Sequence, residues 1–294
     1  MNYFWTNTIW FILLGVTTII EVAYFLIKSK NRTLTVAFYL AVSGMVFLIE
    51  MGLFGFFRAY DYYPKIFHQI SQLDDNLAGN VFSQFSLAAS ALLICVLNLK
   101  YYWYLIIALL YGAIEQLFLY LGIYTQHWYH TWMTVAGLIL LFIIVKLAYN
   151  KVFTGRPRRI FKYILMYFTV FAPHTDLISW PFRLVGGVPT FNERILTNPV
   201  ISGELLFGIS FNVLTNTILI AYFLRFKWWG HSMVILALYL FYYMAYRFNY
   251  IIYKDIGLSM LFATLEIFGM YLWVFVFDRL YDNHLEKKRQ PFEE

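Results

Sequence analysis

Long apolar stretches separated by short polar segments run through the whole chain. Residues 79–99 and 205–224 contain no Asp, Glu, Lys or Arg over the roughly 20 residues that a helix needs to cross a bilayer. These stretches are continuously apolar and do not alternate, which excludes the strands of a membrane β-barrel. Because helices satisfy their own backbone hydrogen bonds inside lipid, the pattern predicts an all-α, polytopic helical membrane protein.

Nine such stretches are expected to span the membrane. They cover residues 5–27, 34–56, 81–99, 103–124, 132–149, 160–180, 202–224, 229–249 and 256–277. The sixth is the least regular, because Lys162, His174 and Asp176 interrupt it and two prolines lie near its end. A broken or re-entrant helix is therefore the alternative for this segment.

The composition agrees with this class of protein. Hydrophobic residues make up 61% of the chain and charged residues only 13%, about half the share in an average soluble domain. This balance excludes a soluble enzyme, a disordered regulator and a nucleic-acid-binding domain. The expected partners are membrane lipids and a small solute or lipid, not a nucleic acid.

The loops between the nine spans differ in their positive charge. Sixteen of the 22 Lys and Arg residues fall in one set of loops and six in the other. Positively charged loops face the cytoplasm. The sequence therefore predicts a plasma-membrane protein whose N-terminus is outside and whose C-terminus is cytoplasmic.

The two halves of the chain share a weak internal repeat. Residues 82–85 (Phe-Ser-Gln-Phe) open a span that ends near Lys100, and residues 207–211 (Phe-Gly-Ile-Ser-Phe) open one that ends near Lys227. An even number of helices in each copy makes the copies parallel in the membrane. The predicted segments are a leading helix at 1–33, four-helix repeats at 34–150 and 158–282, a basic linker at 151–157 and a cytoplasmic tail at 283–294.

One run of residues resembles a known family. It extends from Ala113 to Tyr124, contains Glu115 and is followed by His127 and Trp128. With an acidic residue and a glycine in an earlier span, here at 50 and 52, it resembles small multi-spanning membrane proteins of spore-forming Firmicutes. The resemblance covers roughly residues 34–150 and implies a topology and a host range, not an activity. The second copy has Tyr242 where the first has the glutamate.

Ionisable residues inside the spans are the candidate functional groups, because each costs about 2.5–3.5 kcal/mol to insert and normally faces a partner. Most are expected in the outer half of the membrane or at its outer edge, whereas Glu266 is expected near the middle and Glu21 nearer the cytoplasm. The predicted solute- or ion-binding residues are Glu50, Arg58, Glu115, Asp176, Arg183 and Arg247. If they converge, they form a polar pocket that opens outward.

Glu115 stands out because no Lys or Arg lies within one or two helical turns of it. It is therefore expected to pair with Arg247 on another helix or to be protonated. In the alternative interpretation, Glu50–Arg58 and Asp176–Arg183 are salt bridges that only fix helix packing.

No cofactor or metal site is predicted. His127 and His130 lie three residues apart, a spacing that zinc sites use, but no His-Glu-x-x-His motif or cysteine pair accompanies them. The single cysteine, Cys95, is typical of a small buried hydrophobe.

Three functions follow as hypotheses. The first is binding or transport of a small polar or amphipathic solute, or of a lipid headgroup, in the outward pocket; Glu115→Gln is then expected to abolish activity without loss of the folded protein. The second is a membrane-embedded enzyme that uses a carboxylic acid on an isoprenoid or lipid, although no Pro-Glu-Glu motif is present. The third is a non-catalytic membrane or spore-membrane subunit. The balance leans against an enzyme.

Overall fold

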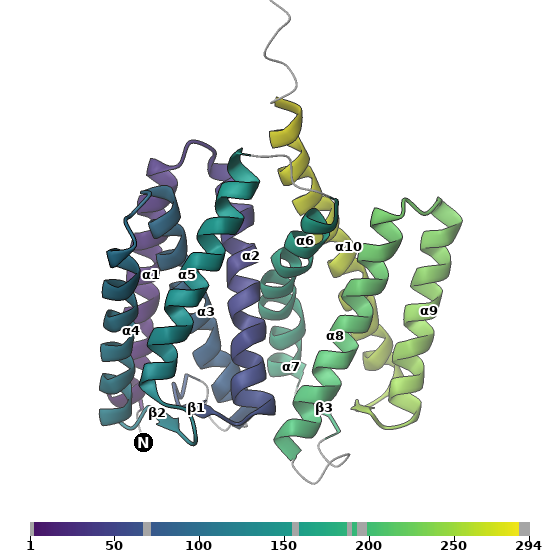
Figure 1. Cartoon of the computed structure of the whole chain (residues 1–294). Coiled ribbons are helices and arrows are strands. Elements are labelled where there is room, and N and C mark those ends of the chain that lie inside the picture. Colours follow the sequence, from purple (N-terminus) through teal and green to yellow (C-terminus); the bar gives the residue numbers. More distant parts are fainter. Residues whose placement is uncertain (1–2, 67–71, 155–158, 187–189, 193–198, 288–294) are drawn as a thin grey trace, which may run out of the picture. The chain divides into compact units, whose positions relative to one another are not determined.

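The computed structural model describes residues 3–66, 72–154, 159–186, 190–192 and 199–287. The chain divides into two compact units, Met1–Pro157 and Arg158–Glu294. The boundary lies beside the predicted basic linker at 151–157. Each unit is built from helices and one pair of very short strands (Figure 1).

The first unit has five long helices. Its elements are the π-helical turn η1 (Phe4–Thr8), α1 (Ile9–Lys28), α2 (Arg32–Met51), the π-helical turn η2 (Gly52–Phe56), β1 (Tyr60–Tyr62), α3 (Gln72–Val96), α4 (Tyr102–Tyr120), β2 (Tyr124–Gln126) and α5 (Thr131–Thr154). In Figure 1 the five helices run side by side, with β1 and β2 at the end where the N-terminus lies.

Helix α3 is the core of this unit, and it packs against α1, α2 and α5. Small residues such as Ala88, Ala89 and Ser90 are buried along it and let neighbouring helices approach closely. The helix begins at Gln72, nine residues before the predicted span at 81. Its first turn carries Asp74 and Asp75, and negative side chains stabilise the N-terminal end of a helix.

The strands β1 and β2 form an antiparallel pair that closes one end of the first unit. Tyr60 pairs with Gln126 and Tyr62 pairs with Tyr124. The N-terminal segment is fixed to the same end, because Asn7 donates a hydrogen bond to the carbonyl of Tyr63 at 2.8 Å. No strand was predicted at these positions.

The second unit contains α6 (Arg159–His174), the π-helical turn η3 (Thr175–Ser179), α7 (Trp180–Gly186), β3 (Thr190–Phe191), α8 (Pro199–Phe223), α9 (Trp228–Arg247), β4 (Ile251–Ile252) and α10 (Ile256–Lys287). Helix α10 packs against α6, α8 and α9. The strands β3 and β4 pair antiparallel.

The irregular sixth segment is helical throughout. The elements α6, η3 and α7 follow one another without an interruption, and Pro173 lies inside α6 just before the π-helical turn. A proline removes one backbone hydrogen bond and crowds the preceding turn, so a local widening of the helix at this point has a physical cause. The helix is distorted but it does not turn back.

All nine predicted spans overlap helices, although the span predicted at 103–124 runs past the end of α4 into β2. Seven helices in the described residues are long and apolar enough to cross a membrane. Many large apolar side chains face outward, such as Leu109, Leu110 and Leu147. An apolar outer surface of this extent suits lipid rather than water. The prediction of a helical membrane protein is confirmed at this level.

The ends of corresponding helices in the two units have the same hydrogen bonds. After α3, the amide of Leu99 donates to the carbonyl of Ile94; after α8, the amide of Phe226 donates to that of Ala221. The three backbone hydrogen bonds that end α4, from the amides of residues 121–123, recur after α9 from the amides of residues 248–250. The residue numbers differ by 127 in each case, as do those of Lys100 and Lys227. In each unit a strand then follows and pairs with the strand after the earlier π-helical turn.

Candidate binding pocket

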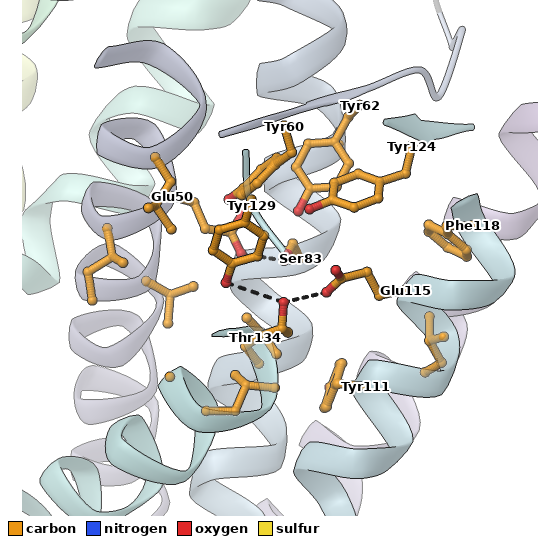
Figure 2. A pocket seen from close by; sticks show the side chains of 18 of the residues that line it. Glu50, Tyr60, Tyr62, Ser83, Tyr111, Glu115, Phe118, Tyr124, Tyr129 and Thr134 are labelled. Atoms are coloured by element: carbon orange, nitrogen blue, oxygen red, sulfur yellow. Dashed lines mark hydrogen bonds between the residues drawn. The ribbon is translucent and has the colours of Figure 1, made fainter. Parts of the chain in front are cut away.

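A pocket of about 190 Å³ lies inside the first unit, next to the β1–β2 pair. All five long helices contribute to its wall: Leu14 from α1, Val46 from α2, Leu87 from α3, Ile114 from α4 and Leu141 from α5. Figure 2 shows its polar side chains approaching one another from several helices.

Four tyrosines cover one end of the pocket. Tyr60 and Tyr62 come from β1, Tyr124 from β2 and Tyr129 from the loop before α5. The ring of Tyr60 lies 5.2 Å from that of Tyr124 and 5.4 Å from that of Tyr129, measured between centroids. In Figure 2 their hydroxyl groups point into the space between the helices. We call these four residues the tyrosine cap.

The strand geometry explains this placement. Successive side chains on a strand point to opposite faces, so Tyr60 and Tyr62 face the same side. The antiparallel register places Tyr124 opposite Tyr62. Burial raises the pKa of Tyr60 and Tyr62 well above the ordinary value, and the nearby carboxyl of Glu50 adds to the rise. Both therefore remain neutral phenols.

Helix α3 must carry a glycine where the tyrosine cap rests on it. A Cβ at Gly79 would lie 2.5 Å from the Cβ of Tyr62, well inside contact distance. Only a residue without a side chain lets the strand approach the helix this closely. Gly79 itself lines the pocket.

Glu50 contributes a buried carboxyl group to the pocket, with 7% of the residue exposed. Its Oε1 accepts a hydrogen bond of 2.5 Å from the hydroxyl of Ser83 on α3. Its Oε2 is buried and has no hydrogen-bond partner among the described residues. A buried carboxyl oxygen without a partner is costly, and it favours a bound cation or a proton.

Glu115 faces the same pocket from α4 and is fully hydrogen-bonded. One oxygen accepts bonds from the side chains of Gln126 and Thr131, and the other accepts a bond from Thr134. Thr134 is also hydrogen-bonded to Tyr129, 3.2 Å away (Figure 2). These three donors are uncharged, whereas an arginine was expected to pair with Glu115. A glutamine at this position could keep these bonds, because its NH₂ group can donate to the hydroxyl of Thr134, so Glu115→Gln is expected to stay folded.

The rest of the pocket wall is apolar or aromatic, and among the described residues that line it none is basic. The pocket thus combines two carboxyl groups, five phenol rings (the tyrosine cap and Tyr111) and an apolar floor. Aromatic faces and carboxylates both attract positive charge.

Of the predicted site residues, the structure brings Glu50 and Glu115 together. Arg58 follows η2, is exposed and does not line this pocket. The described residues contain no ion pair between Glu50 and Arg58, because Glu50 bonds to Ser83 instead. The prediction that Arg58 shares the site has no support in this geometry.

The other three predicted residues belong to the second unit. Asp176 is half-buried in η3, and Arg247 is exposed at the end of α9. The backbone of Arg183 lies in α7, while its side chain is outside the described residues. The pocket described above is formed by the first unit alone, so the pairing of Glu115 with Arg247 stays a prediction.

The second unit has its own buried polar cluster. The ring of His174 is 2.9 Å from a carboxyl oxygen of Glu266, whose other oxygen accepts a bond of 2.7 Å from Ser179. The cluster joins α6 and η3 to α10. Both oxygens of Glu266 are paired within the cluster, while Nδ1 of His174 has no hydrogen-bond partner among the described residues. Pairing of the carboxyl group with neighbouring helices is typical of a contact that fixes helices in place.

Nothing in the described ranges gathers three His, Cys, Asp or Glu side chains as a metal ion would require. The sequence-based reasoning missed the tyrosine cap, although the alternation of Tyr60 and Tyr62 carried a signal for it. Comparison with known proteins identifies no relative. No family model, curated protein or solved structure matches the chain. The resemblance to membrane proteins of spore-forming Firmicutes therefore stays a prediction.

Proposed function

We propose that this protein binds a small organic cation in the pocket of its first unit and carries it across the membrane. The observation on which this depends is the unpartnered carboxyl oxygen of Glu50, buried under the tyrosine cap in a pocket without a basic residue among its described lining. An ammonium group beside this oxygen would supply the missing partner. The tyrosine rings would add cation–π attraction of about 0.5–2 kcal/mol.

The pocket also selects by size and polarity. An engineered cavity of about 150 Å³ in another protein accommodates benzene, so the 190 Å³ measured here suits a molecule such as choline or benzylamine. The apolar floor, which includes Leu14, Leu138 and Leu141, would contact the carbon body of the ligand. The expected ligand is therefore amphipathic, with one positive charge.

The transport part of the proposal depends on an internal duplication. The recurring helix ends support two parallel four-helix repeats behind one leading helix, an arrangement found in transporters. We place nine spans in the plasma membrane with the N-terminus outside, following the charge asymmetry of the loops. In this orientation the tyrosine cap faces the exterior, because it lies at the same end as the N-terminus.

The enzyme hypothesis is the less favoured alternative. A protonated Glu50 among aromatic rings would also suit acid catalysis on an isoprenoid. The volume of the pocket, however, is small for a long isoprenoid chain. A changed lipid profile in cells that carry Glu50→Gln would favour the enzyme over the carrier.

Binding is tested by the thermal midpoint of the purified full-length protein in detergent. Choline is expected to raise the midpoint in a saturable way, because a ligand that binds the folded state stabilises it. Its neutral isostere 3,3-dimethyl-1-butanol is expected to have little effect. In Glu50→Gln, the choline concentration that gives half of the maximal rise in the midpoint should increase about 10–100-fold. This factor corresponds to the loss of one charge-assisted contact.

Glu266→Gln is the matched control, since Glu266 is a buried carboxyl residue in the second unit that does not line the pocket. It should lower the midpoint without changing the choline dependence. Equal stabilisation by the neutral isostere, or unaltered choline dependence in Glu50→Gln, would contradict the proposal.

A further inference from the structure

A second polar cluster lies deeper in the first unit, on the far side of the pocket from the tyrosine cap. Its centre is the hydroxyl of Tyr111 on α4, which is hydrogen-bonded to Ser86 at 2.7 Å and to Ser90 at 3.0 Å. Ser90 in turn donates a bond of 2.9 Å to the carboxyl of Glu21 on α1. The three residues Tyr111, Ser90 and Glu21 form an unbroken chain of hydrogen bonds across three helices.

This chain begins at the pocket. Tyr111 is one of the residues that line it, together with Glu115 one helical turn along the same face of α4. Ser90 lies seven residues beyond Ser83, the partner of Glu50, which corresponds to about 10 Å along the helix axis. The chain thus leads from the binding site about a third of the way through the hydrocarbon.

A carboxyl group at the position of Glu21 is energetically costly, and such residues inside a membrane span usually have a function. It lies within a span, and its contacts among the described residues are with neutral groups. It is bonded to Ser90, and the titratable side chains that face it are Tyr39 of α2 and Tyr111 of α4. No ion pair of Glu21 occurs within the described part of the chain. A lone intramembrane carboxyl group joined to hydroxyl groups is typical of a proton relay.

We propose that Tyr111, Ser90 and Glu21 form a proton path that couples cation binding in the pocket to proton movement. This depends on the proposed function, since the cation is what displaces the proton. The titratable groups at the pocket end are Glu50, Glu115 and the tyrosine cap.

The transfer is balanced in protons and charge. A cation that binds beside Glu50 favours the carboxylate, so Glu50 releases its proton to water in the pocket. That water passes a proton to the hydroxyl of Tyr111, Tyr111 passes its own to Ser90, and Ser90 passes its own to the carboxylate of Glu21. The hydroxyl groups are regenerated, one carboxyl group has lost a proton and the other has gained it. Release from Glu21 to the opposite side, followed by uptake of a new proton by Glu50 from the exterior once the cation has left, moves one cation and one proton in the same direction.

The test uses the full-length protein in liposomes that contain a trapped pH-sensitive dye. Choline is the probe because its permanent charge prevents it from carrying a proton itself. External choline, compared with external sodium, should make the interior more acidic in the wild type. In Glu21→Gln and Tyr111→Phe this change should be at least about tenfold slower.

Choline binding should remain in Glu21→Gln, within about twofold of the wild type in the thermal-midpoint assay, because Glu21 does not line the pocket. Tyr111→Phe, at a position that lines the pocket, is compared only in the pH assay. Tyr24→Phe is the control, since Tyr24 lies on the same helix as Glu21 and is exposed. Choline uptake without a pH change, or wild-type pH changes in both variants, would overturn the proton path. If choline fails to bind the wild type, the proposed function fails instead, and the two failures are thereby distinguished.

Discussion

Replacing Gly79 by alanine tests whether the tyrosine cap forms the pocket. The new Cβ would lie 2.5 Å from both the Cβ and the Cγ of Tyr62 and 2.9 Å from its Cδ2. These atoms are attached closely to the strand backbone, so β1 itself must move. Overpacking of this kind costs about 1–3 kcal/mol, and the rigid contact places the cost near the upper end. Alanine favours a helix by about 1 kcal/mol over glycine, so the net loss should be about 2 kcal/mol.

Gly269→Ala is the matched control in the second unit. Its Cβ would lie 2.4 Å from Cδ1 of Ile178, which is just as close but at the end of a flexible side chain. Moving one side chain off its rotamer costs about 0.5–1.5 kcal/mol, which the gain in helix propensity offsets. The unfolding free energy of Gly269→Ala should therefore be close to that of the wild type.

Denaturant titration of the purified variants measures both free energies, and the choline-dependent thermal midpoint reports the pocket. Gly79→Ala should lose stability and bind choline about tenfold more weakly, since a loss of about 1.4 kcal/mol in binding corresponds to a factor of ten. The reasoning is refuted if Gly79→Ala is as stable as Gly269→Ala, or if it is destabilised while its choline affinity stays unchanged.

Two further predictions concern the other pocket groups. Glu115→Gln should change the unfolding free energy by less than about 1 kcal/mol, because its NH₂ group can donate to the hydroxyl of Thr134, and the loss of its negative charge should weaken choline binding; a loss of more than about 3 kcal/mol in denaturant titration would contradict this arrangement. Burial raises the pKa of Tyr60 and Tyr62 in the folded state, so their contribution to stability is fully present below about pH 10 and is lost as the pH rises above it. The thermal midpoint should therefore fall above that pH, and less so in Tyr60→Phe; equal pH profiles for the two proteins would exclude this cause.

The spans were predictable because they follow directly from apolar length. Each expected segment overlaps a helix, and seven helices of the described residues are long and apolar enough to cross a membrane. The extent of α3 was not predictable in the same way. Its first turns contain Asp74, Asp75 and Asn76, which hydropathy assigns to a loop. Asn76 accepts a hydrogen bond from the amide of Tyr62 in β1 and Asp75 accepts one from the amide of Lys65, and these bonds hold the helix there.

The site was predictable only in part. A charged group in an apolar run is conspicuous, so Glu50 and Glu115 could be found from the sequence. Their partners could not, because Ser83, Thr131 and Thr134 are ordinary residues in a span and gain a role only through three-dimensional proximity. Arg58 does not line the pocket, and a basic residue just beyond a span usually marks an interface rather than a site.

The central claim is that a small organic cation binds between the tyrosine cap and Glu50. The most direct measurement is a crystal structure of the full-length protein with 4-bromobenzylamine, whose bromine can be located by anomalous scattering. We predict one bromine peak in the pocket of the first unit, on its apolar floor, with the ammonium group within hydrogen-bond distance of Glu50 Oε2. A peak elsewhere, or an empty pocket at a concentration that saturates the thermal shift, would contradict it.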